Sequence, residues 1–221
     1  MNHPIQPSHE NPPLRGADAA LYFLPQGHYL FRWCEASGLS GSKFVTADDL
    51  QAAFALSERD TGWLPPGIVR AGYGKHGDWF VLFAPPQKIA IHLLDIGSLT
   101  LPVPALVLAG TGRSYYLWAL AEPFSPQARV YDAPFPNVHD GGKICWGNNT
   151  PPQASPANCQ AAWKLFFESP FNSHLVQGKT RRHDDDVRKL LVKLNGKQKF
   201  PLRELAASRG TLASNIERLF K

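Results

Sequence analysis

Cysteine is scarce in this sequence of 221 residues, and its distribution excludes two common uses of it. There are three cysteines, Cys34, Cys145 and Cys159. Their number is odd and no two lie close together, which argues against a disulfide framework and against a zinc ribbon. Nothing else in the sequence requires a metal, and we expect no cofactor.

Long apolar runs are also missing. No stretch approaches the ~20 apolar residues that a membrane-spanning helix needs. The first residues, MNHPIQPSHENPPLRG, are polar and proline-rich and do not resemble a signal peptide. The sequence therefore predicts a cytoplasmic protein with reduced thiols and no contact with a membrane.

Nucleotide-binding signatures are absent too. The sequence contains neither GxGxxG nor a P-loop. The string GTGRS at 110–114 lacks the Lys-Ser/Thr ending and does not open a helix, so we interpret it as a hairpin turn. A βαβ nucleotide-binding sheet is therefore not expected.

Proline and glycine, by contrast, are abundant, at 20 and 18 residues. Such a density of helix breakers favours strands and loops over long helices. Apolar segments with strand character come first and helical patterns follow, which is typical of an α+β fold with an antiparallel sheet. The expected strands are 20–24, 28–35, 78–84, 88–94 and YYLWALA (115–121), and the expected helices are 46–56 and 158–171.

Local signals place the ends of several of these elements. PQGH at 25–28 and PPQ at 85–87 are predicted turns, each joining two successive strands into a hairpin. Thr46 is the expected N-cap of the first helix, and Pro170 is expected to end the second. The prolines of LTLPVPALVLAG exclude a central-strand role at their own positions.

Composition divides the chain into three parts. Residues 1–18 are expected to form a flexible N-terminal tail, because they are rich in proline and poor in apolar residues. Residues 19–178 form the main domain, which holds the strands. Residues 179–221 are expected to be a C-terminal helical extension, whose first helix has Asp184 and Gly196 as candidate caps.

The chain is basic, with a net charge of +5 and a pI of about 9.2. This balance permits contact with nucleic acid or with an acidic protein. The sequence shows neither a helix-turn-helix nor aromatic residues interleaved with basic ones, so nucleic acid is not the expected partner. The late basic residues, including KTRRH at 179–183, are interpreted as a solvated face.

The segment FPNVHDGGKICWGN places Cys145 eight positions after Asn137. Gly141 and Gly142 permit a tight turn and a close approach of a bulky substrate. Asn137 carries an amide donor suited to an oxyanion. Free cysteine is nevertheless among the most buried residue types, so these residues leave open whether Cys145 is a nucleophile or a packing residue.

Other residues have less certain parts in such a site. His139 is a candidate base, although on an extended chain its side chain can point away from Cys145. His174 is a candidate neighbour of the site, with a surface or packing role as the alternative. Trp146 is expected either to form a wall of a substrate groove or to be purely structural. Cys34 and Cys159 are interpreted as packing residues.

PNVHDGGKIC resembles the active-site signature of ubiquitin-conjugating enzymes, which reads His-Pro-Asn-(Ile/Val), three variable residues, Gly, any residue, (Ile/Val), Cys. The matching positions are Pro136, Asn137, Val138, Gly142, Ile144 and Cys145. LTLPVPALVL resembles that family's proline-rich segment. APFPNV, GKICWGN and SPFN make the stretch from about 19 to 178 most similar to a bacterial subgroup, PRTRC system protein B, of plasmids and mobile elements.

The resemblance implies a UBC-like fold, an antiparallel meander sheet with flanking helices. It implies that Cys145 receives a ubiquitin-like protein as a thioester from a ThiF-type adenylating enzyme and passes it to an amine, with Asn137 stabilising the oxyanion. A JAB-type metalloprotease is an expected neighbour of the same system. The residues expected to line the substrate site are Pro136, Gly142, Trp146 and His139.

Two departures from the signature leave alternatives open. Phe135 replaces the family's His, which mainly organises the loop, and Trp146 stands where Leu is usual. Some UBC-fold proteins have no activity, so a non-catalytic binding or scaffold protein of a plasmid or mobile element is the main alternative. A DNA-associated protein of plasmid maintenance and a cysteine hydrolase are further ones, and the hydrolase would need a His close to Cys145.

Overall fold

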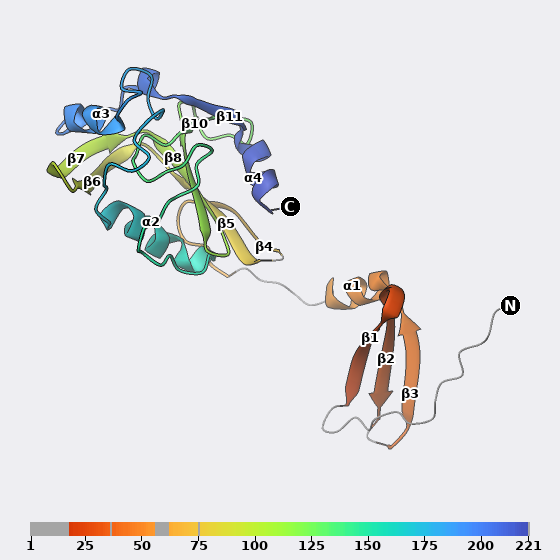
Figure 1. The fold of residues 1–221 in the computed structure, drawn as a ribbon. Helices are drawn as coiled ribbons and strands as arrows, with labels where there is room; N and C mark the ends of the chain where they lie inside the picture. Colours follow the sequence, from red (N-terminus) through yellow and green to blue (C-terminus); the bar gives the residue numbers. More distant parts are fainter. Residues whose placement is uncertain (1–17, 36, 56–61, 75, 221) are drawn as a thin grey trace. The chain divides into compact units, whose positions relative to one another are not determined.

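The computed structural model describes residues 18–35, 37–55, 62–74 and 76–220. The chain divides into two compact units, Met1–Gly62 and Trp63–Lys221 (Figure 1). The sequence did not indicate a boundary at this position. The tail expected for residues 1–18 lies outside the described residues, except for Asp18.

The first unit contains a three-stranded antiparallel sheet, in the order β1 (Ala19–Leu24), β2 (His28–Cys34), β3 (Ser40–Val45), followed by helix α1 (Ala47–Ala55). The turn predicted at 25–28 is confirmed as a short 3-10 helix, η1 (Pro25–Gly27). Thr46 caps α1 as predicted, because its hydroxyl accepts from the N–H of Asp49 and the Asp49 carboxylate accepts from the N–H of Thr46. None of the described residues of this unit is buried.

The second unit is built on a six-stranded antiparallel sheet, in the order β11–β10–β9–β8–β5–β4. Strands β8 and β9 are joined by the two residues Gly112 and Arg113, so the hairpin turn predicted at GTGRS is confirmed. Gly112 has a φ of 56°, which suits such a two-residue turn. The strands are β4 (Ile68–Gly74), β5 (Gly77–Ala84), β8 (Ala105–Thr111), β9 (Ser114–Leu120), β10 (Arg129–Asp132) and β11 (Ala207–Thr211).

Strands β6 (Gln87–Leu93) and β7 (Gly97–Val103) form a separate two-stranded antiparallel hairpin. The hairpin predicted at PPQ, between 78–84 and 88–94, is wrong. Strand β5 already pairs with β4 along one edge and with β8 along the other, so β6 pairs with β7 instead. Pro102 lies in β7, outside the six-stranded sheet, in agreement with the position expected for a strand proline.

Three helices flank the sheets of the second unit: α2 (Cys159–Glu168) after η2 (Pro156–Asn158), α3 (Val187–Leu194), and α4 (Leu212–Phe220). Helix α2 ends at Glu168, and its C-cap Ser169 lies directly before Pro170, which agrees with the predicted end. The N-cap of α3 is Asp186 and not Asp184, because the Asp186 carboxylate accepts from the N–H of Arg188 at 2.9 Å. Gly196, with a φ of 74°, directly follows the C-cap Asn195.

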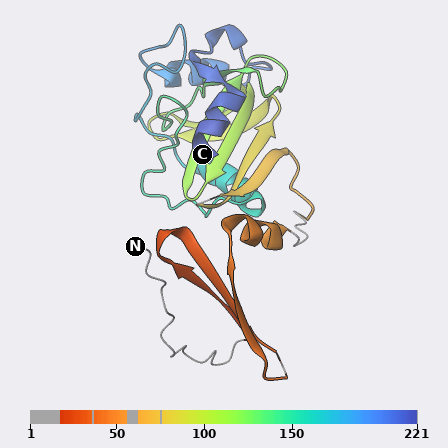
Figure 2. The same ribbon diagram turned by 90° about the vertical axis from the view of Figure 1, so that its right-hand side faces the viewer.

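Both faces of the six-stranded sheet are buried, by α2 on one side and α4 on the other (Figures 1 and 2). Side chains alternate between the two cores along each central strand. Phe80, Leu82, Leu106, Leu108 and Leu117 belong to the core with α2, α3 and the β6–β7 hairpin, whereas Val81, Val107, Ala109 and Trp118 belong to the core with α4.

Residues 179–221 were expected to be helical, and in the structure they also contain strand β11 and the 3-10 helix η3 (Leu202–Glu204). Helix α3 contributes Val187 and Leu191 to the larger core, and β11 adds a strand to the sheet. The described residues, with antiparallel sheets and four α-helices, agree with the predicted α+β class. Among them no helix is both long enough and apolar enough to cross a membrane.

Candidate active site

The segment that carries the cysteine motif lies along strand β9. Two backbone hydrogen bonds attach it there, from Ile144 N to Tyr115 O and from Leu117 N to Gly142 O, each 2.8 Å long. The indole Nε1 of Trp118 also donates to Gly141 O at 3.0 Å. The ordered strand of the sheet therefore fixes the position of the segment.

Residues 137–145 form a closed loop. The N–H of Cys145 donates to Asn137 O at 2.8 Å, Val138 and Ile144 form a bridge, and His139 N donates to Lys143 O at 2.8 Å. Asn137 adopts a φ of 60°, a left-handed conformation that asparagine tolerates better than most residues. The two ends of the motif, Asn137 and Cys145, are thus held directly opposite each other.

Gly142 occupies a position that only glycine fits. Its φ is 93°, and a Cβ placed on it would lie 2.5 Å from Trp118 Nε1 and 2.9 Å from Leu117 O. The indole of Trp118 therefore already occupies the space that a side chain at position 142 would need. Gly142 accordingly acts through the backbone path of the loop, and it is absent from the lining of the pocket beside Cys145.

Cys145 is half-buried and lines a pocket of about 180 Å³. Asn137 and Trp146 line the same pocket, so the structure brings these three predicted residues together. The other walls come from residues 147–149, from Phe166 of α2 and from the segment after α2, which includes Pro170 and His174.

The two remaining candidates lie outside the pocket lining. Pro136 is buried, and His139 is exposed. The ring of His139 is perpendicular to that of His174, with 6.5 Å between their centroids. His174 also fixes the loop, because its backbone O accepts from the N–H of Asn137 at 3.0 Å.

Two polar side-chain atoms around the pocket are buried without a hydrogen-bond partner among the described groups, Asn137 Oδ1 and Trp146 Nε1. Leaving such a group unpaired costs about 1–3 kcal/mol. Both atoms are therefore available to accept or donate a hydrogen bond to a ligand in the pocket.

The Trp146 ring is held edge-on against Tyr115 and Phe166, at centroid distances of 5.4 and 6.2 Å. Trp146 therefore both packs on the core and forms a wall of the pocket.

Phe135, which replaces the signature's His, is fully buried. Its ring contacts those of Phe166, Phe167 and Phe171 at centroid distances of 6.2, 5.3 and 6.1 Å. Aromatic pairs of this kind contribute about 0.5–1.5 kcal/mol beyond their buried area. Apolar packing against α2 therefore anchors the start of the motif.

The loop also forms an ion pair that the sequence did not reveal. Lys179 is 1% exposed, and its Nζ lies 2.9 Å from Asp140 Oδ1. This ammonium group lowers the pKa of Asp140. The run KTRRH was interpreted as a solvated face, and for Lys179 that interpretation is wrong, because its side chain is buried and pairs with Asp140.

The other two cysteines are placed differently from each other. Cys159 packs in the core as predicted, and burial raises the pKa of its thiol. Cys34, also expected to be a packing residue, is exposed at the end of β2, in a unit whose described residues are not buried. No cluster of three or more metal-ligating side chains occurs among the described residues.

Comparison with known protein families gives a match that covers most of the chain. The family described as prokaryotic E2 family D matches residues 44–208, well over half of the chain and all of the loop and pocket residues. Comparisons with curated proteins and with solved structures give no significant match. The chain therefore belongs to prokaryotic E2 family D, a bacterial family similar to the E2, or ubiquitin-conjugating, enzymes.

Proposed function

We propose that this protein carries a ubiquitin-like protein as a thioester on Cys145 and transfers it to an amine acceptor. The observation that carries the proposal is the placement of Cys145 and Asn137 on one closed loop, where both line a pocket of about 180 Å³. Membership of an E2-like family supports conjugating chemistry in general. We also propose that the strands and helices of the second unit have a UBC-like arrangement.

In the first step the thiolate of Cys145 attacks the carbonyl carbon of a thioester on the activating enzyme. A C–S bond forms to Cys145 Sγ, and the C–S bond to the activating enzyme breaks, so that its sulfur leaves as a thiolate. The half-buried position of Cys145 leaves its sulfur accessible for such an exchange. The step needs no metal and no redox partner.

In the second step an amine attacks the new thioester. A C–N bond forms, the C–S bond to Cys145 breaks, and the proton lost by the amine balances the thiolate that is released. The tetrahedral intermediate carries an oxyanion, for which the amide N–H groups of Asn137 are suitable donors. The hydrogen bond from Cys145 N to Asn137 O keeps this residue close to the reacting sulfur.

The resemblance to PRTRC system protein B extends the proposal to partners. These are a ThiF-type adenylating enzyme that supplies the thioester, a ubiquitin-like protein that is carried, and a JAB-type protease in the same system. The setting is a bacterial cytoplasm and a plasmid or mobile element. Pro136, Gly142 and His139 would act through the loop, whereas Trp146 would contact the tail of the ubiquitin-like protein.

The test combines the protein with the ThiF-type enzyme and the ubiquitin-like protein encoded beside it, with and without ATP, on a non-reducing gel. We expect a larger band that requires ATP, disappears with a thiol reductant and is lost in Cys145→Ala. Cys34→Ala is the matched control, because Cys34 is the more exposed cysteine and lies in the other unit. Asn137→Ala should still form the band but discharge it to amines about 100- to 1,000-fold more slowly.

The same experiment separates the proposal from its alternative. If the activating enzyme becomes charged and no band forms on this protein, the transferase function is excluded. Binding of the ubiquitin-like protein that persists in Cys145→Ala would then identify a non-catalytic scaffold. A band of equal intensity in Cys145→Ala, together with loss of the band in Cys34→Ala, would mean that Cys34 carries the thioester and would contradict the proposed role of Cys145.

A further inference from the structure

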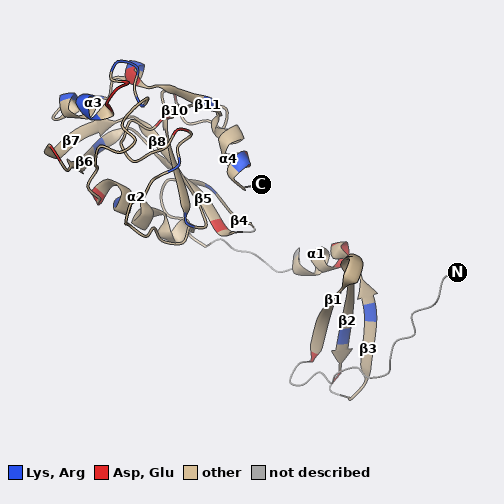
Figure 3. Ribbon diagram, in the orientation of Figure 1, with Lys and Arg blue, Asp and Glu red and all other residues tan. Residues whose placement is uncertain are grey.

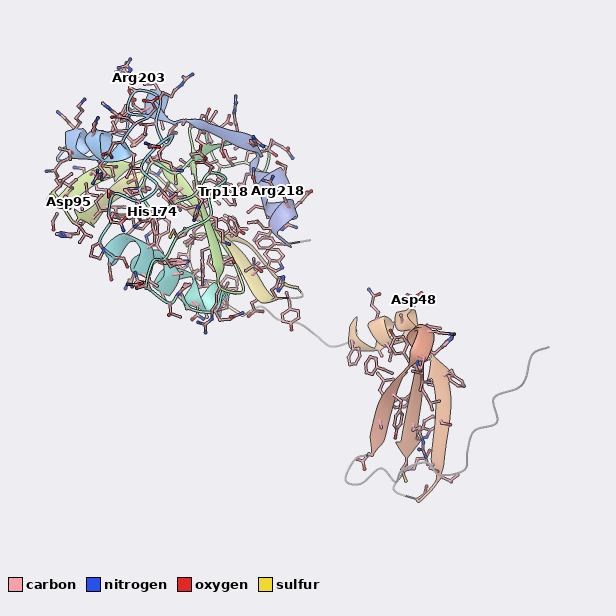
Figure 4. The ribbon with its side chains drawn as sticks, viewed as in Figure 1. Asp48, Asp95, Trp118, His174, Arg203 and Arg218 are labelled. Carbon is pink, nitrogen blue, oxygen red and sulfur yellow. The ribbon has the colours of Figure 1, made fainter. Side chains whose placement is uncertain are left out.

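A second pocket lies on the other side of the motif loop, between the sheet and helix α4. It has a volume of about 680 Å³ and shares no lining residue with the pocket beside Cys145. Tyr116 of β9, Asp132 of β10 and Gly141 of the loop line it, and so do Arg209 and Arg218 from the C-terminal elements. Figure 4 shows Trp118, another lining residue, and Arg218 on adjacent elements.

A bulge in strand β11 brings Arg209 to this pocket. Arg129 pairs with Thr211 and Tyr131 pairs with Ala207. Between these pairs β11 has two residues more than β10, so the backbone of β11 bulges out of the regular pairing. Asn215, which is 2% exposed, fixes the bulge by donating from Nδ2 to Arg209 O at 2.8 Å and to Thr211 O at 2.9 Å. Bulges of this kind often redirect side chains at functional sites.

The same asparagine positions the second arginine. Arg218, one turn further along α4, donates from its guanidinium to Asn215 Oδ1. Neither Arg209 nor Arg218 forms an ion pair with any carboxylate in the described part of the chain. The buried amide of Asn215 thus holds the backbone of Arg209 and the guanidinium of Arg218, and no described carboxylate pairs with either arginine.

The carboxyl groups of the pocket do not compensate these arginines. Asp140 is paired with the buried Lys179. Burial raises the pKa of Asp132, an effect that Ser208 and Lys179 partly offset, and its Oδ1 has no hydrogen-bond partner among the described groups. Lys179 therefore supplies the positive charge near both carboxyls, and the arginines remain available to a ligand.

From this arrangement we infer that the pocket binds an oxyanion, a carboxylate or a phosphate group, between Arg209 and Arg218. The planar guanidinium matches both groups with paired N–H donors. The volume exceeds that of a free ion, and Tyr116 and Leu219 give the pocket an apolar wall for the rest of the ligand. This site does not depend on the chemistry of Cys145.

The indole N–H of Trp118 provides a direct probe of binding, because it lines the pocket and donates to Gly141 O. In a ¹H–¹⁵N spectrum its signal is assigned by comparison with Trp118→Phe. The full-length protein is titrated with inorganic phosphate and, separately, with a triglutamate peptide, at constant ionic strength set with sodium chloride. We expect a saturable shift of the Trp118 indole and of the Gly141 amide.

The arginines are tested with Arg209→Gln/Arg218→Gln, in which the affinity of the bound probe should fall at least tenfold. Arg209→Gln alone is the second variant: the Arg209 side chain forms no ion pair within the described part of the chain, so this change should preserve the fold, and it should weaken binding as well. Arg203→Gln is the matched control, because Arg203 is exposed in η3, away from this pocket (Figure 4). It should bind as the native protein does.

Saturation by phosphate alone identifies a phosphate-bearing ligand, and saturation by the peptide alone identifies a carboxylate-bearing one. The inference is overturned if neither probe shifts the indole, if the shift does not saturate, or if the double arginine variant binds as tightly as Arg203→Gln.

Discussion

Gly142 shows how closely a single residue of the motif is tied to the sheet beneath it. Replacing it by alanine adds a methyl group that would lie 2.5 Å from the indole Nε1 of Trp118, at a φ of 93°. The left-handed backbone costs about 1–2 kcal/mol and overpacking costs a similar amount. We expect Gly142→Ala to lower the free energy of unfolding by about 3 kcal/mol, measured by urea denaturation.

Gly141→Ala is the matched control for this prediction. Gly141 has a similar φ of 81°, but a Cβ placed on it would meet nothing within 4 Å. Gly141→Ala should therefore lower the free energy of unfolding only by the cost of the left-handed backbone, about 1–2 kcal/mol. Equal losses in the two variants would show that the contact with Trp118 is unimportant.

Single residues also show which parts of the candidate site the sequence could reveal. Asn137, Gly142 and Cys145 are recognisable because their spacing is local and their residue types are rare in combination. Lys179 is not, because its partner Asp140 lies 39 positions away and its burial depends on the tertiary fold. Asn215 and the pocket that it supports are hidden for the same reason.

At the scale of elements, the ion pair of Asp140 and Lys179 joins the motif loop to the C-terminal segment. Removing a partner of a buried charge destabilises more than removing the charge itself. Because the Asp140 side chain is 94% exposed, water screens the pair, and we expect Asp140→Asn to cost only about 1 kcal/mol at pH 7. Lys179→Met should leave the free energy of unfolding nearly unchanged, and the double variant Asp140→Asn/Lys179→Met should be as stable as Lys179→Met.

The pH dependence of this pair has a definite sign. Lys179 lowers the pKa of Asp140 below its ordinary value of 3.8, so the pair stabilises the fold above that value. The contribution is lost as the pH falls through the lowered pKa, because Asp140 is then neutral in the native protein too. The stability difference between the native protein and Asp140→Asn should therefore disappear in strong acid, and urea denaturation as a function of pH measures it. A difference that grows with acidity would exclude the pair as its source.

Several elements with strong local patterns were predicted, whereas strands defined by their neighbours were not, and the apolar strand β8 was missed because it follows directly on the prolines of LTLPVP. The apolar strand β5 and the capped helix α1 follow from their own residues. The segments SGSKFV, IVRAGYG, RVYD and ASRGT are short, polar or rich in glycine, and they are strands because an adjacent strand offers hydrogen-bond partners. The wrong hairpin at PPQ has a similar cause, since proximity in sequence does not decide which edge of β5 is free.

At the scale of the whole molecule, the buried residues that the structure describes belong to one of the two units. Among the described residues, the buried hydrophobic side chains all lie between Phe80 and Ile216, in two clusters that share the six-stranded sheet. The basic residues of the C-terminal part surround the same unit, on α3, around η3 and on α4 (Figure 3). This distribution predicts that the second unit is stable without the first.

A fragment of residues 63–221 tests this prediction. It retains both cores, the motif loop and the two pockets, so we expect one cooperative thermal transition within a few degrees of that of the full chain, followed by circular dichroism. Residues 1–62 alone should unfold without cooperativity, because a three-stranded sheet whose described residues are not buried has too little core to fold independently. A fragment 63–221 that melts far below the full chain would instead mean that the second unit depends on the first. The family match begins at residue 44 and so includes the end of the first unit, which makes this the outcome to exclude.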